Sequence, residues 1–354
     1  MQGKSADPIV CVAGAGSIGL TLAGRLMIGG ARVRLVARQA SVDFIRQDGL
    51  RLVDTDGAHH LRPETGVASH FSAADILFLC SKSYDLAELA VSVRHLISAD
   101  TLVVPIVNGV PWWYFDGRND VWDGQPILAV DPENRLKTVI SSRQVIGTTT
   151  MVTAERLDRG TVRIMNGLQM TIGELDDRVT PRLAELGLLL ERSGFRVDIV
   201  PRIRDAVWNK VAKNLISNPL TAITGASLGT VFSEPVLAKV SRQMLHEVTP
   251  LIEAHGARLD IDEQSIFLQG AKLGAFKTSM LQDIERGRPL ELAAICDAVL
   301  ELAAGHGIAM PVVEAVRNIA HYCSERPDEG VLLPAQSARP ATAEVVKGDF
   351  SRRQ

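Results

Sequence analysis

The sequence predicts an α/β domain over residues 8–200, followed by an all-α domain over residues 201–326. In the first part of the chain, apolar runs of strand length alternate with stretches of helical composition. After Pro201 no strand of comparable strength appears, and helical patterns dominate. The length of 354 residues agrees with two domains of about 150 residues each. Residues 327–354, rich in Pro, Gly, Ala and charges, are expected to form a loosely ordered tail.

The composition excludes several classes of protein. Hydrophobic residues make up 46% and charged residues 22% of the chain, which is typical of a soluble globular protein. The net charge of −3 gives no electrostatic reason to expect nucleic acid or an anionic membrane as a partner. No apolar run approaches the roughly 20 residues that a membrane helix needs, and the N-terminus lacks the apolar core of a signal peptide.

The cysteines also argue against a metal site. Cys11, Cys80, Cys296 and Cys323 are widely separated and show neither metal-ligand spacing nor a disulfide framework. We therefore expect no bound metal and a reducing, cytoplasmic location.

The first strand, expected at Ile9–Ala13, runs directly into a glycine-rich turn. A helical stretch, Leu20–Met27, follows, and the next strand is expected at Arg32–Ala37. Strand, Gly-x-Gly-x-x-Gly, helix and strand in this order indicate a Rossmann-type dinucleotide-binding domain, because the glycines admit the pyrophosphate and the helix N-terminus attracts its charge. The expected cofactor-binding residues of the turn are Gly14, Ala15, Gly16, Ser17, Ile18 and Gly19. A turn that serves only packing is the alternative.

The end of the second strand favours NADP(H) over NAD(H). NAD sites usually place a carboxylate there to hold the ribose 2′-hydroxyl, whereas this strand ends in Arg38. An arginine at this point can pair with the 2′-phosphate of NADPH. The alternative is that Arg38 is a solvated surface residue.

Two further strands lead to candidate cofactor residues. Asp75–Cys80 is expected to be a buried strand and is followed by Lys82, and the strand Thr101–Val107 runs into Asn108-Gly109. Ligands of open α/β sheets bind beyond the carboxyl ends of the strands, so Lys82 and Asn108 are expected to face the cofactor. A surface-loop lysine and an ordinary Asn-Gly turn are the alternatives. Between these strands a helix is expected at Tyr84–Ile97, and Leu50–Val53 has the pattern of a hairpin or edge strand.

The α/β pattern is interrupted from Pro111 to Val139. The run Trp112-Trp113-Tyr114-Phe115 opens this insertion. These aromatic residues either line a substrate entrance or form a small packed cluster, and the pattern does not decide between the two.

Short β-rich runs then resume and are expected to close the first sheet as a meander. They lie at Val145–Val152, Gly160–Met165 and Gln169–Gly173. The helix Pro181–Ser193 and a last strand, Phe195–Val200, complete the domain. The helices expected after it are Arg202–Ser217, Glu234–His255, Leu281–Arg286, Pro289–His306 and Pro311–Glu325.

The helix ending near Pro219 carries an unusual polar row. Its apolar stripe consists of Trp208, Val211, Ala212, Leu215 and Ile216, at the spacing of a helix that faces a core. Lys210, Asn214 and Asn218 step by fours along another face. Pro219 is expected to stop or kink the helix. Either the row faces solvent or it contributes to a site.

With these motifs in place, the chain resembles the ketopantoate reductase (2-dehydropantoate 2-reductase) family over roughly residues 9–325. The resemblance rests on the glycine turn, on Lys82, on Asn108-Gly109, on the segment Trp208–Ile223 and on the block Thr278–Ile284 that leads to Glu291. It implies NADPH bound to the first domain and a small 2-keto acid bound between the domains. Lys210 and Glu291 match the catalytic lysine and its acidic partner. The other matches are Asn108, Asn214, Asn218 and Ser279 on the substrate side, and Lys82, Asn108 and Arg38 on the cofactor side.

The chemistry of these residues agrees with that assignment. Hydride delivered to a ketone leaves an alkoxide, and the Lys210 ammonium can stabilise and protonate it. Glu291 is expected to orient Lys210. As structural alternatives, Glu291 occupies the first turn of a helix that starts at Pro289, and Ser279 begins a capping box.

Three functions are compatible with this pattern. The first is NADPH-dependent reduction of ketopantoate to pantoate, a step of pantothenate biosynthesis. The second is a 2-hydroxyacid dehydrogenase of the same family that acts on another branched or aromatic 2-keto acid, since the insertion departs from shorter family members. The third is a non-enzymatic NADP-binding regulator. A homodimer is compatible with the apolar helix faces of the second domain.

Overall fold

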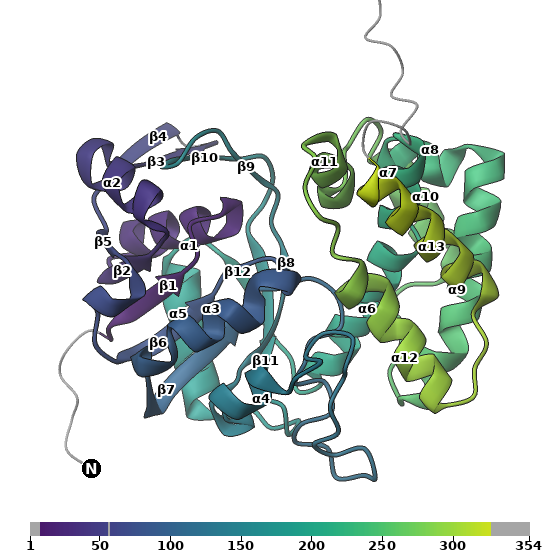
Figure 1. Ribbon diagram of the computed structural model, residues 1–354, viewed down its shortest axis with the longest axis horizontal. Coiled ribbons are helices and arrows are strands. Elements are labelled where there is room, and N and C mark those ends of the chain that lie inside the picture. Colours follow the sequence, from purple (N-terminus) through teal and green to yellow (C-terminus); the bar gives the residue numbers. More distant parts are fainter. Residues whose placement is uncertain (1–7, 56, 327–354) are drawn as a thin grey trace, which may run out of the picture.

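The computed structural model describes residues 8–55 and 57–326, which form an α/β domain beside a helical domain (Figure 1). The predicted fold class is therefore confirmed. The expected tail over residues 327–354 lies outside the described residues. Within them, no helix has the length and apolarity to cross a membrane.

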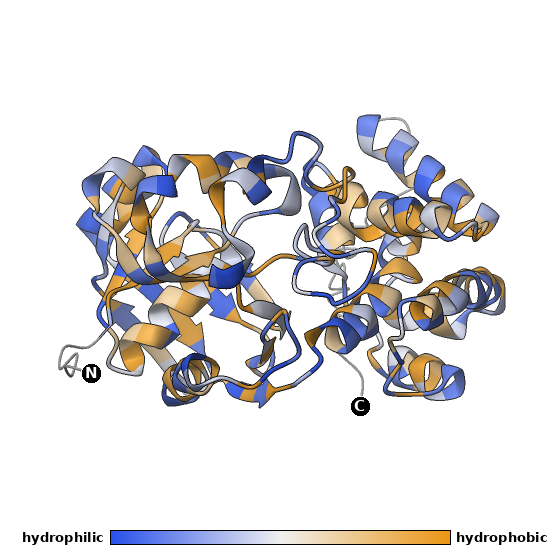
Figure 2. Ribbon diagram, turned by 90° about the horizontal axis from the view of Figure 1, so that it is seen from below, coloured by the Kyte–Doolittle hydropathy of each residue, from blue (hydrophilic) through white to orange (hydrophobic). Residues whose placement is uncertain are grey.

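A parallel sheet with the strand order β5-β2-β1-β6-β7 forms the centre of the first domain. Its strands are β1 (Val10–Ala13), β2 (Val33–Val36), β5 (Glu64–Gly66), β6 (Ala74–Leu79) and β7 (Ile97–Pro105). Elements on both faces cover the sheet, so β1 is apolar and fully buried, and Figure 2 shows the strands of this domain as mainly hydrophobic. The carboxyl ends of β1, β6 and β7 lie at one edge, as the candidate cofactor residues require.

The strands after β7 form separate sheets, so the expectation that they close the first sheet as a meander is wrong. The hairpin β3 (Leu50–Asp54) and β4 (Gly57–Leu61) offers a free edge, and β10 (Thr161–Ile164) pairs with β3 there, with β9 (Ala154–Arg156) beside it. The other sheet has the order β12-β11-β8. Its strands are β8 (Gly147–Met151), β11 (Gln169–Gly173) and β12 (Arg196–Ile199). A bridge between Val103 and Val145 connects it to β7.

Helices surround these sheets. Helix α1 contacts β2 on one side and β3 and β10 on the other, so it lies between two sheets. The helix predicted at Tyr84–Ile97 is shorter, because the chain turns after Ser92 and enters β7 at Ile97. The helices of this domain are α1 (Ser17–Ile28), α2 (Gln39–Asp48), α3 (Leu86–Ser92), α4 (Arg135–Val139) and α5 (Pro181–Arg192).

The second domain contains only helices among the described residues. They are α6 (Ile203–Leu215), α7 (Asn218–Thr224), α8 (Leu228–Ser233), α9 (Pro235–Ala254), α10 (Glu263–Lys272), α11 (Ser279–Glu285), a π-helix (Ala293–Asp297), α12 (Ala298–Gly305) and α13 (Pro311–Glu325). Helix α6 stops before Pro219, as expected, and its apolar stripe is buried. Pro219 then lies in the first turn of α7, so Asn218 belongs to α7 and not to the polar row of α6.

The aromatic insertion is a packed cluster that anchors α6. Trp112, Trp113, Tyr114 and Phe115 are all at most 3% exposed. The Trp208 indole N–H donates to the Tyr114 hydroxyl at 2.7 Å. Arg204 of α6 is buried as well and donates to the backbone carbonyls of Tyr114, Asp116 and Leu175.

All four cysteines are buried, and none of them forms a disulfide. Burial raises the pKa of the Cys11 thiol to about 12, and it also raises the pKa of Cys80 and Cys296. These thiols therefore act as small apolar side chains of the core.

Replacing Tyr114 by Phe tests the anchor of α6. The change leaves the buried Trp208 N–H without its acceptor, so we expect the free energy of unfolding to fall by about 1–3 kcal/mol. Urea denaturation followed by fluorescence and circular dichroism measures the loss. Tyr322→Phe is the control, because Tyr322 is half exposed, and an equal effect of both variants would contradict the role of Tyr114.

Candidate active site

The glycine turn leaves open space at the N-terminus of α1. Gly14 has φ +111°, and a Cβ there would lie 2.2 Å from the carbonyl oxygen of Cys80. A Cβ at Gly19 would lie 1.8 Å from the carbonyl oxygen of Gly14. At Gly16, by contrast, a Cβ meets nothing within 4 Å, and this N-cap residue has no side-chain hydrogen bond. Packing therefore explains Gly14 and Gly19, and the space at Gly16 fits a phosphate group on the helix N-terminus.

Two serine hydroxyls beside the turn lack partners. Ser81 and Ser83 follow β6, and their Oγ atoms are buried without a hydrogen-bond partner among the described residues. Buried hydroxyls are usually satisfied, so these two fit a polar ligand at this strand end. The residues present thus fit a dinucleotide.

Arginines gather where the resemblance places the far end of that ligand. Arg38, the N-cap of α2, is almost fully exposed and lies 3.6 Å from a carboxylate oxygen of Asp85. Arg156 on β9 donates to the Ser41 hydroxyl on α2 at 3.3 Å. Burial lowers the pKa of Arg156, and the positive charges of Arg159, Arg288 and Arg38 lower it further. Arg38 and Arg156 are thus placed where they can bind an anion.

Lys82 joins the two domains through two carboxylates. Its ammonium lies 2.5 Å from Asp283 Oδ2 and 3.0 Å from Glu291 Oε2. Glu291, 4% exposed, also accepts hydrogen bonds from the Ser83 backbone N–H at 3.0 Å and from the Asn108 side chain at 3.3 Å. Burial opposes the charged form of Lys82, but the two carboxylates outweigh it and raise its pKa. Burial also raises the pKa of Asp283.

Lys210 lies apart from this ion pair. Its ammonium donates to the Thr150 hydroxyl at 3.4 Å. Burial lowers the pKa of Lys210 to about 8, and the charge of Glu291 partly opposes the shift. Glu291 was expected to orient Lys210, but the structure gives its hydrogen bonds to Lys82, Ser83 and Asn108, so it acts on Lys210 through space.

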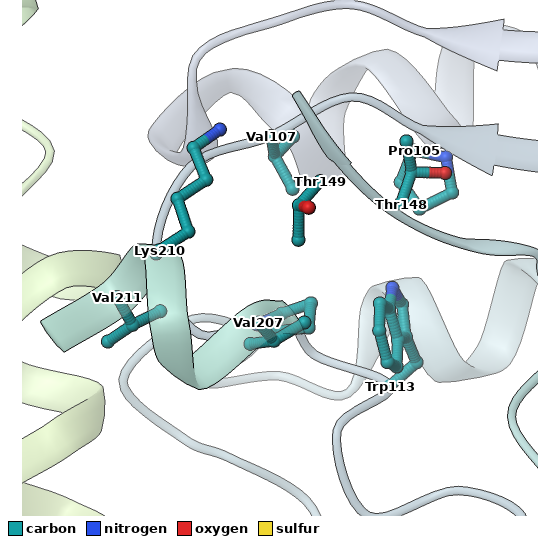
Figure 3. Close-up of a pocket in the computed structure, with 10 residues that line it drawn as sticks. Pro105, Val107, Trp113, Thr148, Thr149, Val207, Lys210 and Val211 are labelled. Atoms are coloured by element: carbon teal, nitrogen blue, oxygen red, sulfur yellow. The ribbon is translucent and has the colours of Figure 1, made fainter. Parts of the chain in front are cut away.

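A pocket beside Lys210 separates α6 from the end of β7 (Figure 3). Lys210 and Trp113 face it from α6 and from the insertion, and Thr148 and Thr149 face it from β8. Its remaining lining residues are Pro105, Val107, Gly109, Pro111, Val207 and Val211. Trp113 thus belongs both to the packed cluster and to the pocket wall.

The Asn108-Gly109 turn packs against the π-helix of the second domain. A Cβ at Gly109, whose φ is +84°, would lie 2.3 Å from the carbonyl oxygen of Ala294. The Val110 backbone N–H donates to the same carbonyl at 2.8 Å. Glycine is therefore required by this contact with the π-helix, in addition to any role beside a ligand.

The remaining substrate candidates lie on three helices. Asn214 is half-buried on α6, and Asn218 is buried at the start of α7, where it accepts from the Ser217 hydroxyl at 3.2 Å. Ser279 is the exposed first residue of α11. The helix cap is Thr278, so the capping box expected from Ser279 is wrong. The Thr278 and Thr221 hydroxyls, 2.6 Å apart, hold α11 against α7.

Glu291 is not in a helical first turn either. The regular helix starts at Leu292 and continues as the π-helix, and Pro289 lies outside it. The structural alternative for Glu291, a place in the first turn of a helix that starts at Pro289, is therefore wrong. Its carboxylate instead accepts hydrogen bonds from Lys82, Ser83 and Asn108 of the first domain.

Comparison with known proteins identifies the family. The family model "Ketopantoate reductase PanE/ApbA" matches residues 10–177, and the model of the C-terminal part of the same family matches residues 202–323. A 2-dehydropantoate 2-reductase of Mesorhizobium japonicum is 32% identical over 310 residues, which cover 87% of this chain and 95% of the relative. The chain belongs to the ketopantoate reductase family.

Solved structures of ketopantoate reductases share the whole fold. A protein of Ralstonia solanacearum MolK2 assigned to these reductases has a TM-score of 0.86 and 28% identity, with 91% of this chain and 99% of the other covered. D-mandelate dehydrogenase, in a ternary structure with NADH and anilino(oxo)acetate, has a TM-score of 0.78 at 19% identity, with 90% and 99% covered. The latter likeness concerns the fold alone. As a ketopantoate reductase family member, the protein is an oxidoreductase, and members of the family use NAD(P)H.

Several contacts of this family member were not predicted from its sequence. One of them is the contact between Lys82 and Asp283. The sequence did contain a signal for it, because Asp283 lies among the buried residues Met280, Leu281 and Ile284 of α11. A carboxylate on a buried helix face requires a partner. Thr150 and Arg156 gave no comparable signal, because both lie in ordinary β-rich segments.

Replacing Glu291 by Gln tests its effect on both lysines. The charge that supports their ammonium forms is removed, so we expect the pKa of Lys210 to fall below about 8 and that of Lys82 to fall as well. The pH dependence of amine acylation, followed residue by residue with mass spectrometry, measures both values. Glu285→Gln is the control, because Glu285 pairs with the exposed Lys277. An unchanged Lys210 titration in Glu291→Gln would contradict the coupling.

Proposed function

We propose that this protein catalyses the NADPH-dependent reduction of a 2-keto acid to the 2-hydroxy acid, with ketopantoate as substrate and pantoate as product. The observation that carries the proposal is the buried ammonium of Lys210 at a pocket beside the end of β7. A pKa of about 8 suits a proton donor near neutral pH, because the group is largely protonated yet gives up its proton more readily than an ordinary lysine.

The roles of the chain's residues follow from their chemistry. A bound reduced nicotinamide supplies the hydride that reaches the carbonyl carbon. Lys210 donates a proton to the keto oxygen, which completes the 2-hydroxy acid. Glu291 keeps Lys210 more basic than burial alone would, while it holds Lys82 and Asn108. The polar side chains of Asn108, Asn214, Asn218 and Ser279 are assigned to the substrate.

The choice of NADPH rests on the arginines. Arg38 follows β2, where the 2′ position of the ribose is expected. Arg156 lies close enough to Arg38 that the positive charge of Arg38 helps to lower the pKa of Arg156. Two guanidinium groups can pair with a 2′-phosphate, whereas a 2′-hydroxyl gains little from them. Arg38 would exchange its contact with Asp85 for the phosphate.

The second candidate is reduction of an aromatic 2-keto acid by the same chemistry. The favouring observation is Trp113, which places an indole ring in the wall of the pocket. D-mandelate dehydrogenase, which shares the fold, was solved with the phenyl-bearing anilino(oxo)acetate. Parallel turnover assays with ketopantoate and phenyl-substituted keto acids separate the two substrates. NADPH binding without turnover of any keto acid would instead favour a non-enzymatic regulator.

Lys210→Ala removes the proton donor. We expect kcat to fall by about 10²–10⁴-fold while the Kd for NADPH stays the same. In the wild type, reduction should be fastest below about pH 8 and slow down as the pH rises through that value, because Lys210 then loses its proton. Lys213→Ala on the same helix is the control. Wild-type turnover by Lys210→Ala would overturn the assignment.

Arg38→Ala tests the cofactor. We expect kcat/KM for NADPH to fall about tenfold or more, with kcat/KM for NADH unchanged, because only NADPH loses a charged hydrogen bond. Arg32→Ala is a matched control, since Arg32 is an exposed arginine at the opposite end of β2. Equal kcat/KM of the wild type for NADH and NADPH would refute the role of Arg38.

A further inference from the structure

Asp85 places a carboxylate beside Arg38, the residue assigned to the 2′-phosphate. Asp85 is the N-cap residue of α3, a position where an aspartate usually accepts a hydrogen bond from the first turn of the helix. Here its side chain makes no such bond, and a carboxylate oxygen lies 3.6 Å from the Arg38 guanidinium. Helix capping therefore does not explain the aspartate, whereas the pair with Arg38 uses its charge.

The two partners of this pair come from opposite sides of the glycine turn. Strands β2 and β6 are the neighbours of β1 in the sheet, and both run parallel to it. Arg38 follows β2, and Asp85 ends the 3₁₀ turn Ser83–Asp85 that follows β6. A dinucleotide bound on the glycine turn carries the ribose of its adenosine toward the end of β2. The 2′ substituent of that ribose therefore meets a guanidinium that already has a carboxylate partner.

The two charges have opposite preferences for this substituent. A guanidinium pairs with a 2′-phosphate, whereas a carboxylate accepts a hydrogen bond from a 2′-hydroxyl and repels a phosphate. A phosphate has to displace Asp85 from Arg38, and a hydroxyl does not. Specificity is a difference of two affinities, so a residue that weakens only one of them changes the choice of cofactor.

We propose that Asp85 is a specificity-determining residue, which limits the preference for NADPH over NADH by pairing with Arg38. The inference rests on the proposed function, which assigns the 2′-phosphate to Arg38. The side chains of Arg38 and Asp85 are 92% and 43% exposed, so the pair can open without disturbing the core. An exposed pair is also weak, so a phosphate can displace the carboxylate, and the enzyme retains its use of NADPH.

The test uses Asp85→Asn, which keeps the shape of the side chain and removes its charge. Asp43→Asn is the matched control, because Asp43 is an exposed aspartate on α2 that bonds to Gln39 of the same helix. Calorimetry on the full chain gives the Kd for NADP⁺ and NAD⁺. The fragments 2′,5′-ADP and 5′-AMP carry the same difference at the 2′ position without a nicotinamide, and circular dichroism shows that the variants are folded.

We expect Asp85→Asn to raise the ratio of the Kd for NAD⁺ to the Kd for NADP⁺ about three- to tenfold, mainly through tighter binding of NADP⁺. The ratio of the two fragments should rise by a similar factor, and Asp43→Asn should leave both ratios near their wild-type values. An unchanged ratio in Asp85→Asn overturns the proposal. An equal rise in Asp43→Asn also overturns it, because any negative charge on this surface would then have the same effect.

A double-mutant cycle tests whether Asp85 acts through its partner. In an Arg38→Ala background the carboxylate has no guanidinium to occupy, so Asp85→Asn should have less than half of its effect on the logarithm of the ratio. An undiminished effect without Arg38 would contradict the role of the pair.

The binding measurements contain no keto acid, so they separate this inference from the proposed function. A protein that binds both dinucleotides and reduces no keto acid would end the proposed function, and the shift in Asp85→Asn would still decide the role of Asp85. A protein that binds neither dinucleotide would overturn both.

Discussion

The ammonium of Lys82 between Asp283 and Glu291 is the contact on which the arrangement of the two domains depends. It joins the end of β6 to α11 and to the segment before the π-helix. Carboxylates as buried as these are stable only with a cationic partner, so the packed arrangement of the two domains requires Lys82 at this place. The same Glu291 holds Asn108, and Gly109 lets the next turn touch Ala294. The edge of the sheet and the helical domain are thereby fixed together where the site is formed.

The insertion forms a second set of contacts between the two domains. Arg204 and Trp208 bind it from α6, and Glu301 of α12 accepts the backbone N–H groups of Leu128 and Ala129 at 2.8 and 2.7 Å. Lys210 lies on the same helix as Arg204 and Trp208, so the position of its ammonium depends on a segment far from it in sequence. The aromatic residues there serve packing and also complete the pocket wall through Trp113. Of the two interpretations left open by the sequence, the structure shows the packed cluster.

The parts of the fold that could be predicted are those with local patterns. The glycine turn between β1 and α1, the buried strands and the apolar stripe of α6 all follow from periodicity and turn chemistry. The partner of β10 could not be found in this way, because β3 lies more than a hundred residues earlier in the chain. Glu291 was identified as a site residue, but its contact with Lys82 spans 209 positions and depends on domain packing. Asn218 was assigned to the wrong helix, since a proline can begin a helix as well as end one.

The buried cysteines have a practical consequence for studying this molecule. Because burial raises the pKa of the thiols of Cys11, Cys80 and Cys296, the reactive thiolate is scarce at neutral pH, and the Cys323 thiol is also buried. Thiol-directed dyes should therefore leave the native chain largely unlabelled. A single cysteine introduced on the surface of each domain would accept a fluorophore pair, so that interdomain motion during turnover becomes visible by energy transfer without first removing the natural thiols.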